Sequence, residues 1–522
     1  MLELLEWGKK RGEETADPES DPKAAAASIA ALGDAEPSTA LGELAARLEA
    51  TGSGAAPNEA LALIQDAGAP HVAAMLARCF AGSAGTPAAR DVIWKSLAEY
   101  QSRLARALCA AAGARLTAQS AARALSACRT LAKIHLVHYE SVPGRLWRVA
   151  YAMHAAAENA GCATAPVHAQ SGQRTMTTVE QEFLRLLMLR VSAPDMMAPE
   201  QIEVAERVVE QLGAEFTLRQ PGVADNPFCF EPESEFPPRR AKRRQLAAST
   251  RYFGPGMGYD SLERIVRQLQ TGKLEDFRPF GKDMSPAVQS STVQHLRTFW
   301  RVDCPYEPPQ HAPASGTLQV VHGYGQLWQY LSETRQGAHE LSLADASAGA
   351  PQPPEAWAMQ GEGGSELGAQ VPQASRGWVK CGEVVGVSPR DGGERWAGMV
   401  RRMHAGPGGG LHADIAVLSR APRAVSLREV LEQYADSIFT NASSRQFVLS
   451  SVHAVILSDG VEPSQPPNLL LAPEAWKEGR IYEAQEGDAV RFLRCLKAVR
   501  RGGDFVRATF EWLSAPEQLA QL

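Results

Sequence analysis

Four short stretches toward the end of the chain decide the fold: EAWAMQGEGGSELGAQVP at 355–372, WVKCGEVVGVS at 378–388, WAGMVRRMH at 396–404 and LHADIAVLS at 411–419. In the last stretch every second residue from Leu411 onward is apolar, the period of a strand with one face on a core. The turn-rich segments PRDGGER and AGPGGG join successive stretches and suit hairpins. The sequence therefore predicts consecutive antiparallel strands in a small barrel or sandwich.

The region before these strands is predicted to be helical. Between 59 and 218, apolar residues recur at spacings of three and four, and breakers such as Ala-Gly-Ala-Pro at 67–70 separate the sets. We expect six or seven helices, one of which begins at Thr177-Thr178-x-Glu180, where a threonine hydroxyl can cap free amides. The predicted fold class is α+β: an N-terminal all-α helical array followed by a C-terminal antiparallel β-barrel region.

Composition shifts along the chain suggest four segments. Residues 1–58 are rich in Ala, Gly, Pro and Glu, and much of this segment is expected to be flexible, with a short helix around Ala40–Ala50. The helical array at 59–218 is followed by an irregular connector at 219–305 with a basic cluster and short helices. Residues 306–522 hold the barrel region and a C-terminal strand extension, within which the spacing of apolar residues predicts a helix at 423–440.

The overall composition excludes several protein classes. The chain has 522 residues, of which 44% are hydrophobic and 21% charged, and its net charge is −6. This balance argues against a general nucleic-acid or membrane-surface binder. The eight cysteines are scattered, so no zinc knuckle or Cys-x-x-Cys pair is present. There is no secretion signal and no run of 18 apolar residues, so we expect a cytoplasmic protein without membrane insertion.

No catalytic signature is recognisable in the sequence. The chain lacks a Gly-x-Ser-x-Gly elbow, a His-Glu-x-x-His helix and a Walker loop, as well as the GGDEF and EAL signatures. His135 and His138 have helical spacing, but no third metal ligand accompanies them. We therefore expect neither catalytic activity nor a metal or cofactor.

The strand region resembles the PilZ family of bacterial cyclic-di-GMP receptor barrels. The resemblance covers about residues 355–420 and rests on a Ser365-x-x-Gly368 turn, a G-x-x-V strand at 382–385 and a G-x-V-R-R strand at 398–402. The turn of the family reads Asp/Asn-x-Ser-x-x-Gly, whereas Gly363 occupies the first position here. The whole chain is also similar to long proteobacterial proteins with a helical N-terminal part and a PilZ-like C-terminal part.

The resemblance implies cyclic-di-GMP as the ligand, because arginine forks suit both its phosphates and its guanine edges. In the family an Arg-x-x-x-Arg pair precedes the barrel, whereas here Arg335 is followed by His339. Arg401 and Arg402 are neighbours on a strand and are expected on opposite faces. The ligand residues that the resemblance implies are Arg335, Ser365, Gly368, Arg401 and Arg402.

A basic cluster in the connector is the sharpest charge feature of the chain. It comprises Arg239, Arg240, Arg243 and Arg244, with Lys242 between them. One interpretation is a patch that binds an anion or a partner, and the other is a solvated linker that pairs with the acidic EPESE at 231–235. The spacing Arg-x-x-x-Arg occurs here too, but too far ahead of Ser365 to match the family.

The functional hypothesis is a non-catalytic signalling or adaptor protein with a PilZ-like domain. It would respond to cyclic-di-GMP and act through contacts with a protein partner. One alternative is a ligand-free scaffold with a degenerate barrel, which the departures at Gly363 and His339 favour. A second alternative is an enzyme with an unrecognised active site.

Overall fold

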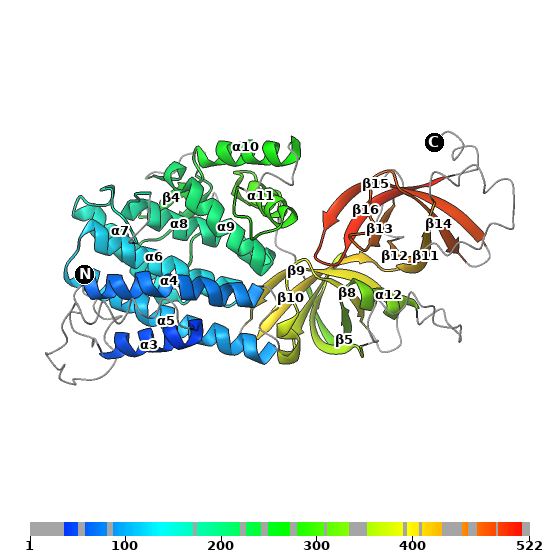
Figure 1. Ribbon diagram of the computed structural model, residues 1–522, viewed down its shortest axis with the longest axis horizontal. Coiled ribbons are helices and arrows are strands. Elements are labelled where there is room, and N and C mark those ends of the chain that lie inside the picture. Colours follow the sequence, from blue (N-terminus) through cyan, green and yellow to red (C-terminus); the bar gives the residue numbers. More distant parts are fainter. Residues whose placement is uncertain are drawn as a thin grey trace. The chain divides into compact units, whose positions relative to one another are not determined.

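The computed structural model forms two compact units, Met1–Glu307 and Pro308–Leu522, which we describe separately (Figure 1). The α+β class is confirmed: helices dominate the first unit, and antiparallel barrels form the second. The structure describes residues 36–50, 58–80, 87–170, 175–219, 226–241, 249–271, 279–306, 311–332, 352–389, 394–406, 410–430, 451–457, 467–486 and 489–513.

The helical unit begins in the described residues with α3 and continues through long helices joined by short connections. Thr178 caps α8 as the sequence predicts, because its hydroxyl accepts a hydrogen bond from the Gln181 amide at 3.1 Å. Two 3-10 turns lie at Pro194–Met196 and Gly213–Glu215. The helices are α3 Pro37–Ala50, α4 Asn58–Phe80, α5 Pro87–Ala114, α6 Ala118–Val137, α7 Gly144–Asn159, α8 Val179–Val191, α9 Pro199–Leu212, α10 Gly258–Thr271 and α11 Pro286–Trp300.

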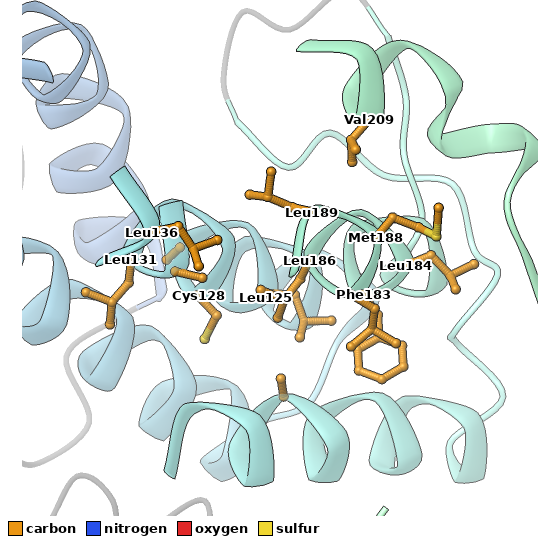
Figure 2. Packing of buried hydrophobic residues seen from close by; sticks show 14 of the residues in the cluster. Leu125, Cys128, Leu131, Leu136, Phe183, Leu184, Leu186, Met188, Leu189 and Val209 are labelled. Atoms are coloured by element: carbon orange, nitrogen blue, oxygen red, sulfur yellow. The ribbon is translucent and has the colours of Figure 1, made fainter. Parts of the chain in front are cut away.

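The core of this unit lies around α6 and α8. Figure 2 shows Leu125 and Cys128 of α6 beside Phe183 and Leu186 of α8, with Val209 of α9 above them. All five side chains are buried. Burial of this apolar surface is the main favourable contribution to the stability of the helical array.

A buried ionic network also ties α6 to α8 and α9. Arg129 of α6 pairs with Glu206 of α9 at 2.7 Å and approaches Glu182 of α8 at 3.6 Å. Lys133 pairs with Glu206 and, at 3.0 Å, with Glu203. Burial alone would lower the pKa of Lys133, but the two carboxylates raise it, so the cation persists in the interior.

The predicted break at 67–70 does not occur, because α4 continues through Pro70. Gly68 lets α5 approach closely, since a Cβ there would lie 2.1 Å from the hydroxyl of Tyr100. That hydroxyl donates to the carbonyl of Ile64 at 3.3 Å. Contacts with α5 therefore stabilise α4 across Pro70, although a proline in this position usually ends a helix.

The same helix contains a stretch, Asn58–Cys79, that is long and apolar enough by composition to cross a membrane, the one such helix among the described residues. No such helix was expected from the sequence. Of this window 44% is buried inside the protein, and core helices pass the same test. Because Leu61, Ile64 and Met75 are buried in the helical core, we interpret α4 as a core helix.

A small antiparallel sheet replaces part of the irregular connector that the sequence predicts. Its strands are β1 Thr217–Arg219, β2 Phe228–Phe230, β3 Arg239–Arg240 and β4 Arg251–Gly254, in the order β1-β4-β2-β3. Phe228 and Phe230 are buried beside Phe253 in the core of the helical unit. The strands are too short for periodicity to reveal them.

The first barrel of the second unit contains the predicted hairpins. It closes in the order β10-β7-β6-β5-β8-β9, and every neighbouring pair is antiparallel. Helix α12, Tyr324–Ser332, follows the first strand, and a 3-10 turn lies at Gln373–Gly377. The strands are β5 Ala312–His322, β6 Glu355–Glu362, β7 Glu366–Val371, β8 Val384–Ser388, β9 Trp396–Ala405 and β10 Leu411–Ser419.

The C-terminal strands close into a second barrel, where the sequence predicts only a strand extension of the first. Its order is β11-β12-β13-β16-β15-β14. The helix predicted at 423–440 is wrong where the structure describes it, because 423–429 form β11 and pair with β12 and β14; residues 431–440 lie outside the described part. The strands are β11 Arg423–Glu429, β12 Ser451–Leu457, β13 Asn468–Leu471, β14 Ile481–Glu486, β15 Ala489–Arg501 and β16 Val506–Leu513.

Helix α12 packs between the two barrels. Leu327 of α12 belongs to one buried cluster with Val384 of the first barrel and Phe505 of the second. The Trp328 indole donates to the carbonyl of Val425 at 3.2 Å and stacks on His453 at 3.6 Å between ring centroids. The two barrels therefore share a hydrophobic core within one compact unit.

Candidate functional site

The Ser365 turn lies at the end of the β6–β7 hairpin. The Gly363 amide donates to the carbonyl of Glu366 at 2.8 Å and closes the turn, while Ser365 is exposed and its carbonyl accepts from the Val417 amide at 2.8 Å. The guanidinium of Arg420 donates to the carbonyl of Gly364 at 3.1 Å. The backbone of the turn is thus fixed by β10, and the Ser365 side chain faces solvent.

Gly368 lies under an imidazole ring. It faces Asp414 of β10 on one side and Gly361 of β6 on the other. A Cβ at Gly361 would lie 2.5 Å from Cβ of His311, and one at Gly368 would lie 3.4 Å from Cδ2 of the same ring. The two glycines thus leave room for His311, whose Nε2 lies 3.2 Å from Oδ1 of the buried Asp414. Neither His311 nor Asp414 was expected from the sequence to belong to the site.

Arg401 reaches across β10 to the ion pair that it forms with Glu366 of β7. Its side chain is 42% exposed, whereas that of Glu366 is only 9% exposed. Glu366 and Gly368 are two residues apart on β7 and therefore share a face. Arg401, Glu366, Gly368 and His311 consequently lie on one outer face of the barrel.

A β-bulge changes the expectation that Arg401 and Arg402 point to opposite faces. The register of β9 and β10 shifts between Asp414 and Ile415, so that Arg402 faces Asp414 while Val400 already faces Ile415. Two arginines on β9 therefore oppose a single residue of β10, and strict alternation does not hold at this pair. Four of the five residues that the resemblance implies lie on or beside this face; Arg335, like His339, falls outside the described residues.

The basic cluster of the connector belongs to the helical unit. Arg239 pairs with Glu231 of the acidic EPESE segment at 2.8 Å. Arg240 donates to the carbonyls of Phe299, Arg301 and Val302 at the end of α11, and its guanidinium lies over the ring of Phe228. These contacts within the helical unit account for both arginines without an anion or a partner. Arg243 and Arg244 lie outside the described residues.

A surface pocket lies at the other end of β7 from the Ser365 turn. Its volume is about 340 Å³, and its lining includes Gln370, Gln373 and Arg376. This volume is at the lower end of the range for small-molecule sites. None of the residues that the resemblance implies lines it.

In the helical unit, His154, Glu158 and Glu180 place possible metal-binding atoms within 4.8 Å of one another. Burial lowers the pKa of His154 to about 4, so its imidazole is neutral at pH 7. However, Arg251 donates to both carboxylate oxygens of Glu158, at 2.8 and 3.1 Å. An arginine therefore already provides the positive charge that an ion would supply, and we assign no metal to this group.

Comparison with known proteins gives a family match that falls on the helical unit. Residues 23–222 match the family model of the N-terminal domain of the cyclic-di-GMP receptor FimW. The matched segment includes α3 to α9 and ends before β2, so it contains neither barrel. No curated protein and no solved structure matches the chain. The chain thus combines a helical unit similar to the N-terminal domain of a cyclic-di-GMP receptor with two closed antiparallel barrels.

Proposed function

We propose that this protein is a non-catalytic cyclic-di-GMP receptor that signals through contacts with a protein partner. The match of residues 23–222 to the N-terminal domain of such a receptor is the observation that carries the proposal. A closed antiparallel barrel with PilZ-like sequence features follows the matched segment. The proposal places the protein in the cytoplasm; its eight cysteines are all free thiols, as is usual in a reducing compartment.

In this proposal the first barrel is PilZ-like and supplies the ligand face. Arg401 is partly exposed and can exchange its carboxylate partner, Glu366, for a phosphate oxygen of the ligand. The exposed hydroxyl of Ser365 lies at the hairpin end as a further donor. Arg335, Gly368 and Arg402 complete the set of ligand residues.

Titration calorimetry of the full-length protein with cyclic-di-GMP tests the proposal. We expect stoichiometric binding that weakens about 10-fold or more in Arg401→Ala, because a charge-assisted hydrogen bond contributes about 1.5–3 kcal/mol. Arg428→Ala is a matched control, since Arg428 lies on β11 of the other barrel, 4.0 Å from Glu483. Cyclic-di-AMP tests whether the guanine edges are recognised.

The outcomes distinguish the receptor function from the location of its binding site. Absence of heat at tens of micromolar protein would overturn the receptor function. Wild-type affinity in Arg401→Ala, Ser365→Ala and Arg335→Ala alike would leave the receptor function standing but refute the PilZ-like location of the site.

A ligand-free scaffold is the second candidate, and the turn itself favours it. Gly363 replaces the Asp or Asn of the PilZ pattern, so the turn has no side chain at that position to contact a ligand. Absence of heat in the same calorimetry, with the protein folded, is the result that this candidate predicts.

A further inference from the structure

Two arginines of the second barrel face each other across neighbouring strands. Arg500 of β15 is the register partner of Arg507 of β16. Like charges in directly opposite positions of a sheet repel each other and lower its stability. Such a pair lowers the stability of the fold unless a group of opposite charge lies between the two side chains.

No such group occurs among the described residues. Neither guanidinium has an ion pair or hydrogen bond within that part of the chain, and Nε of Arg507 is buried without a hydrogen-bond partner. Three other arginines of β15 differ: Arg494 lies 3.3 Å from Glu511, Arg491 covers the ring of Trp512 and Arg501 covers that of Trp476.

The pair also adjoins the first barrel. A Cβ at Gly382, in the loop before β8, would lie 3.1 Å from Nη2 of Arg500, so this guanidinium reaches the other barrel. Gly382 has φ +89°, which favours glycine, and its amide donates to the carbonyl of Val400 on β9 at 2.7 Å. Val400 directly precedes Arg401, so the loop connects the pair with the candidate ligand face.

Burial and neighbouring charges disfavour the charged forms of this pair of guanidinium groups. Burial among protein atoms lowers the pKa of both guanidinium groups. For Arg500 the nearby Cys381 thiol acts in the opposite direction, while the charges of Arg507 and Arg401 lower the pKa further. Arg500 nevertheless retains an exposed side-chain surface, so a ligand can reach it from solvent. A bound anion would relieve the repulsion between Arg500 and Arg507.

We propose that Arg500 and Arg507 bind the phosphodiester groups of a cyclic dinucleotide, so that its site extends from the Arg401 face of the first barrel onto the second. The inference rests on the proposed receptor function. A cyclic dinucleotide suits the geometry because it carries two phosphates in one rigid ring, and guanidinium forks bind phosphate oxygens in pairs. The ligand would join the two barrels and strengthen the contact that α12 already makes between them.

Calorimetry with cyclic-di-GMP on the full-length protein tests the pair through Arg500→Gln, Arg507→Gln and the double variant. We expect each single change to weaken binding about 10-fold or more and the double change to weaken it further. Arg500→Lys should recover only part of the affinity, because lysine keeps the charge but cannot form a fork. Arg428→Gln on β11, which neighbours neither β15 nor β16, should bind like wild type.

A thermal unfolding scan without ligand is the second measurement. Because the substitutions remove a repulsion, the glutamine variants should be as stable as wild type or more so. Wild-type affinity in the folded double variant, while wild type itself binds, would overturn the inference and leave the receptor function intact. Absence of binding by wild type would instead refute the receptor function, and with it this site.

Discussion

Acidification is expected to destabilise the helical unit through one buried histidine. His154 of α7 is 2% exposed and stacks on Phe183 at 4.3 Å between ring centroids. Burial lowers its pKa from the ordinary 6.5 to about 4, although the Glu158 carboxylate, 3.5 Å from Nδ1, acts in the opposite direction. Between these two pH values the unfolded chain binds a proton that the folded chain does not, so stability falls as the pH falls from 6.5 toward 4.

The magnitude follows from the two pKa values. With 6.5 unfolded and about 4 folded, linkage gives a loss of about 2.5 kcal/mol on going from pH 7.5 to pH 4.5. With a urea m-value of about 2–3 kcal/mol per molar, the midpoint should shift down by about 1 M from this group alone. Other groups also titrate, so the contribution of His154 is the difference between wild type and His154→Phe, which keeps an aromatic ring on Phe183.

The assay is urea unfolding at both pH values, followed by circular dichroism at 222 nm. This signal reports mainly on the first unit, because α12 is the one α-helix among the described residues of the second. The midpoint of wild type should fall between pH 7.5 and 4.5 by about 1 M more than that of His154→Phe. Equal shifts in the two proteins would refute a buried, neutral His154.

Three further substitutions test other parts of the structure. Glu206→Gln should destabilise the helical unit by about 3–5 kcal/mol in urea unfolding, because Arg129 and Lys133 lose their shared carboxylate in the interior; a cost below about 1 kcal/mol would mean that the network is hydrated. Gly361→Ala should cost about 1–3 kcal/mol, measured by tryptophan fluorescence, because the new methyl overlaps His311; wild-type stability would show that the ring moves away freely. Phe505→Ala should cost about 3–5 kcal/mol and increase amide exchange in α12, because it empties the core between the barrels; unchanged exchange would contradict that shared core.

Sequence patterns predicted those elements in which the local periodicity and the tertiary packing favour the same secondary structure. Strand β10 was expected from the alternation of its apolar residues, and short helices were expected in the connector, where α10 and α11 occur. The failures have physical causes. At Pro70 the contacts of Tyr100 outweigh a local stop signal, and at 423–429 pairing with β12 and β14 outweighs helical spacing.

Only the turn that contains the short sequence motif of the candidate site could be predicted from the sequence. Ser365 and Gly368 are recognisable because the turn is contiguous in sequence. The ion pair of Arg401 with Glu366 and the approach of His311 to Asp414 depend on barrel register, which the sequence does not reveal. The opposition of Arg500 and Arg507 depends on register shifts within β15 and β16, so periodicity alone cannot locate it.

In our proposal the barrels, rather than the helical unit that contains the family match, bind cyclic-di-GMP. Hydrogen–deuterium exchange with mass spectrometry on the full-length protein, with and without saturating cyclic-di-GMP, tests this claim most directly. We predict that protection concentrates in peptides from β7, β9, β15 and β16. Protection confined to peptides from residues 36–306 would contradict it.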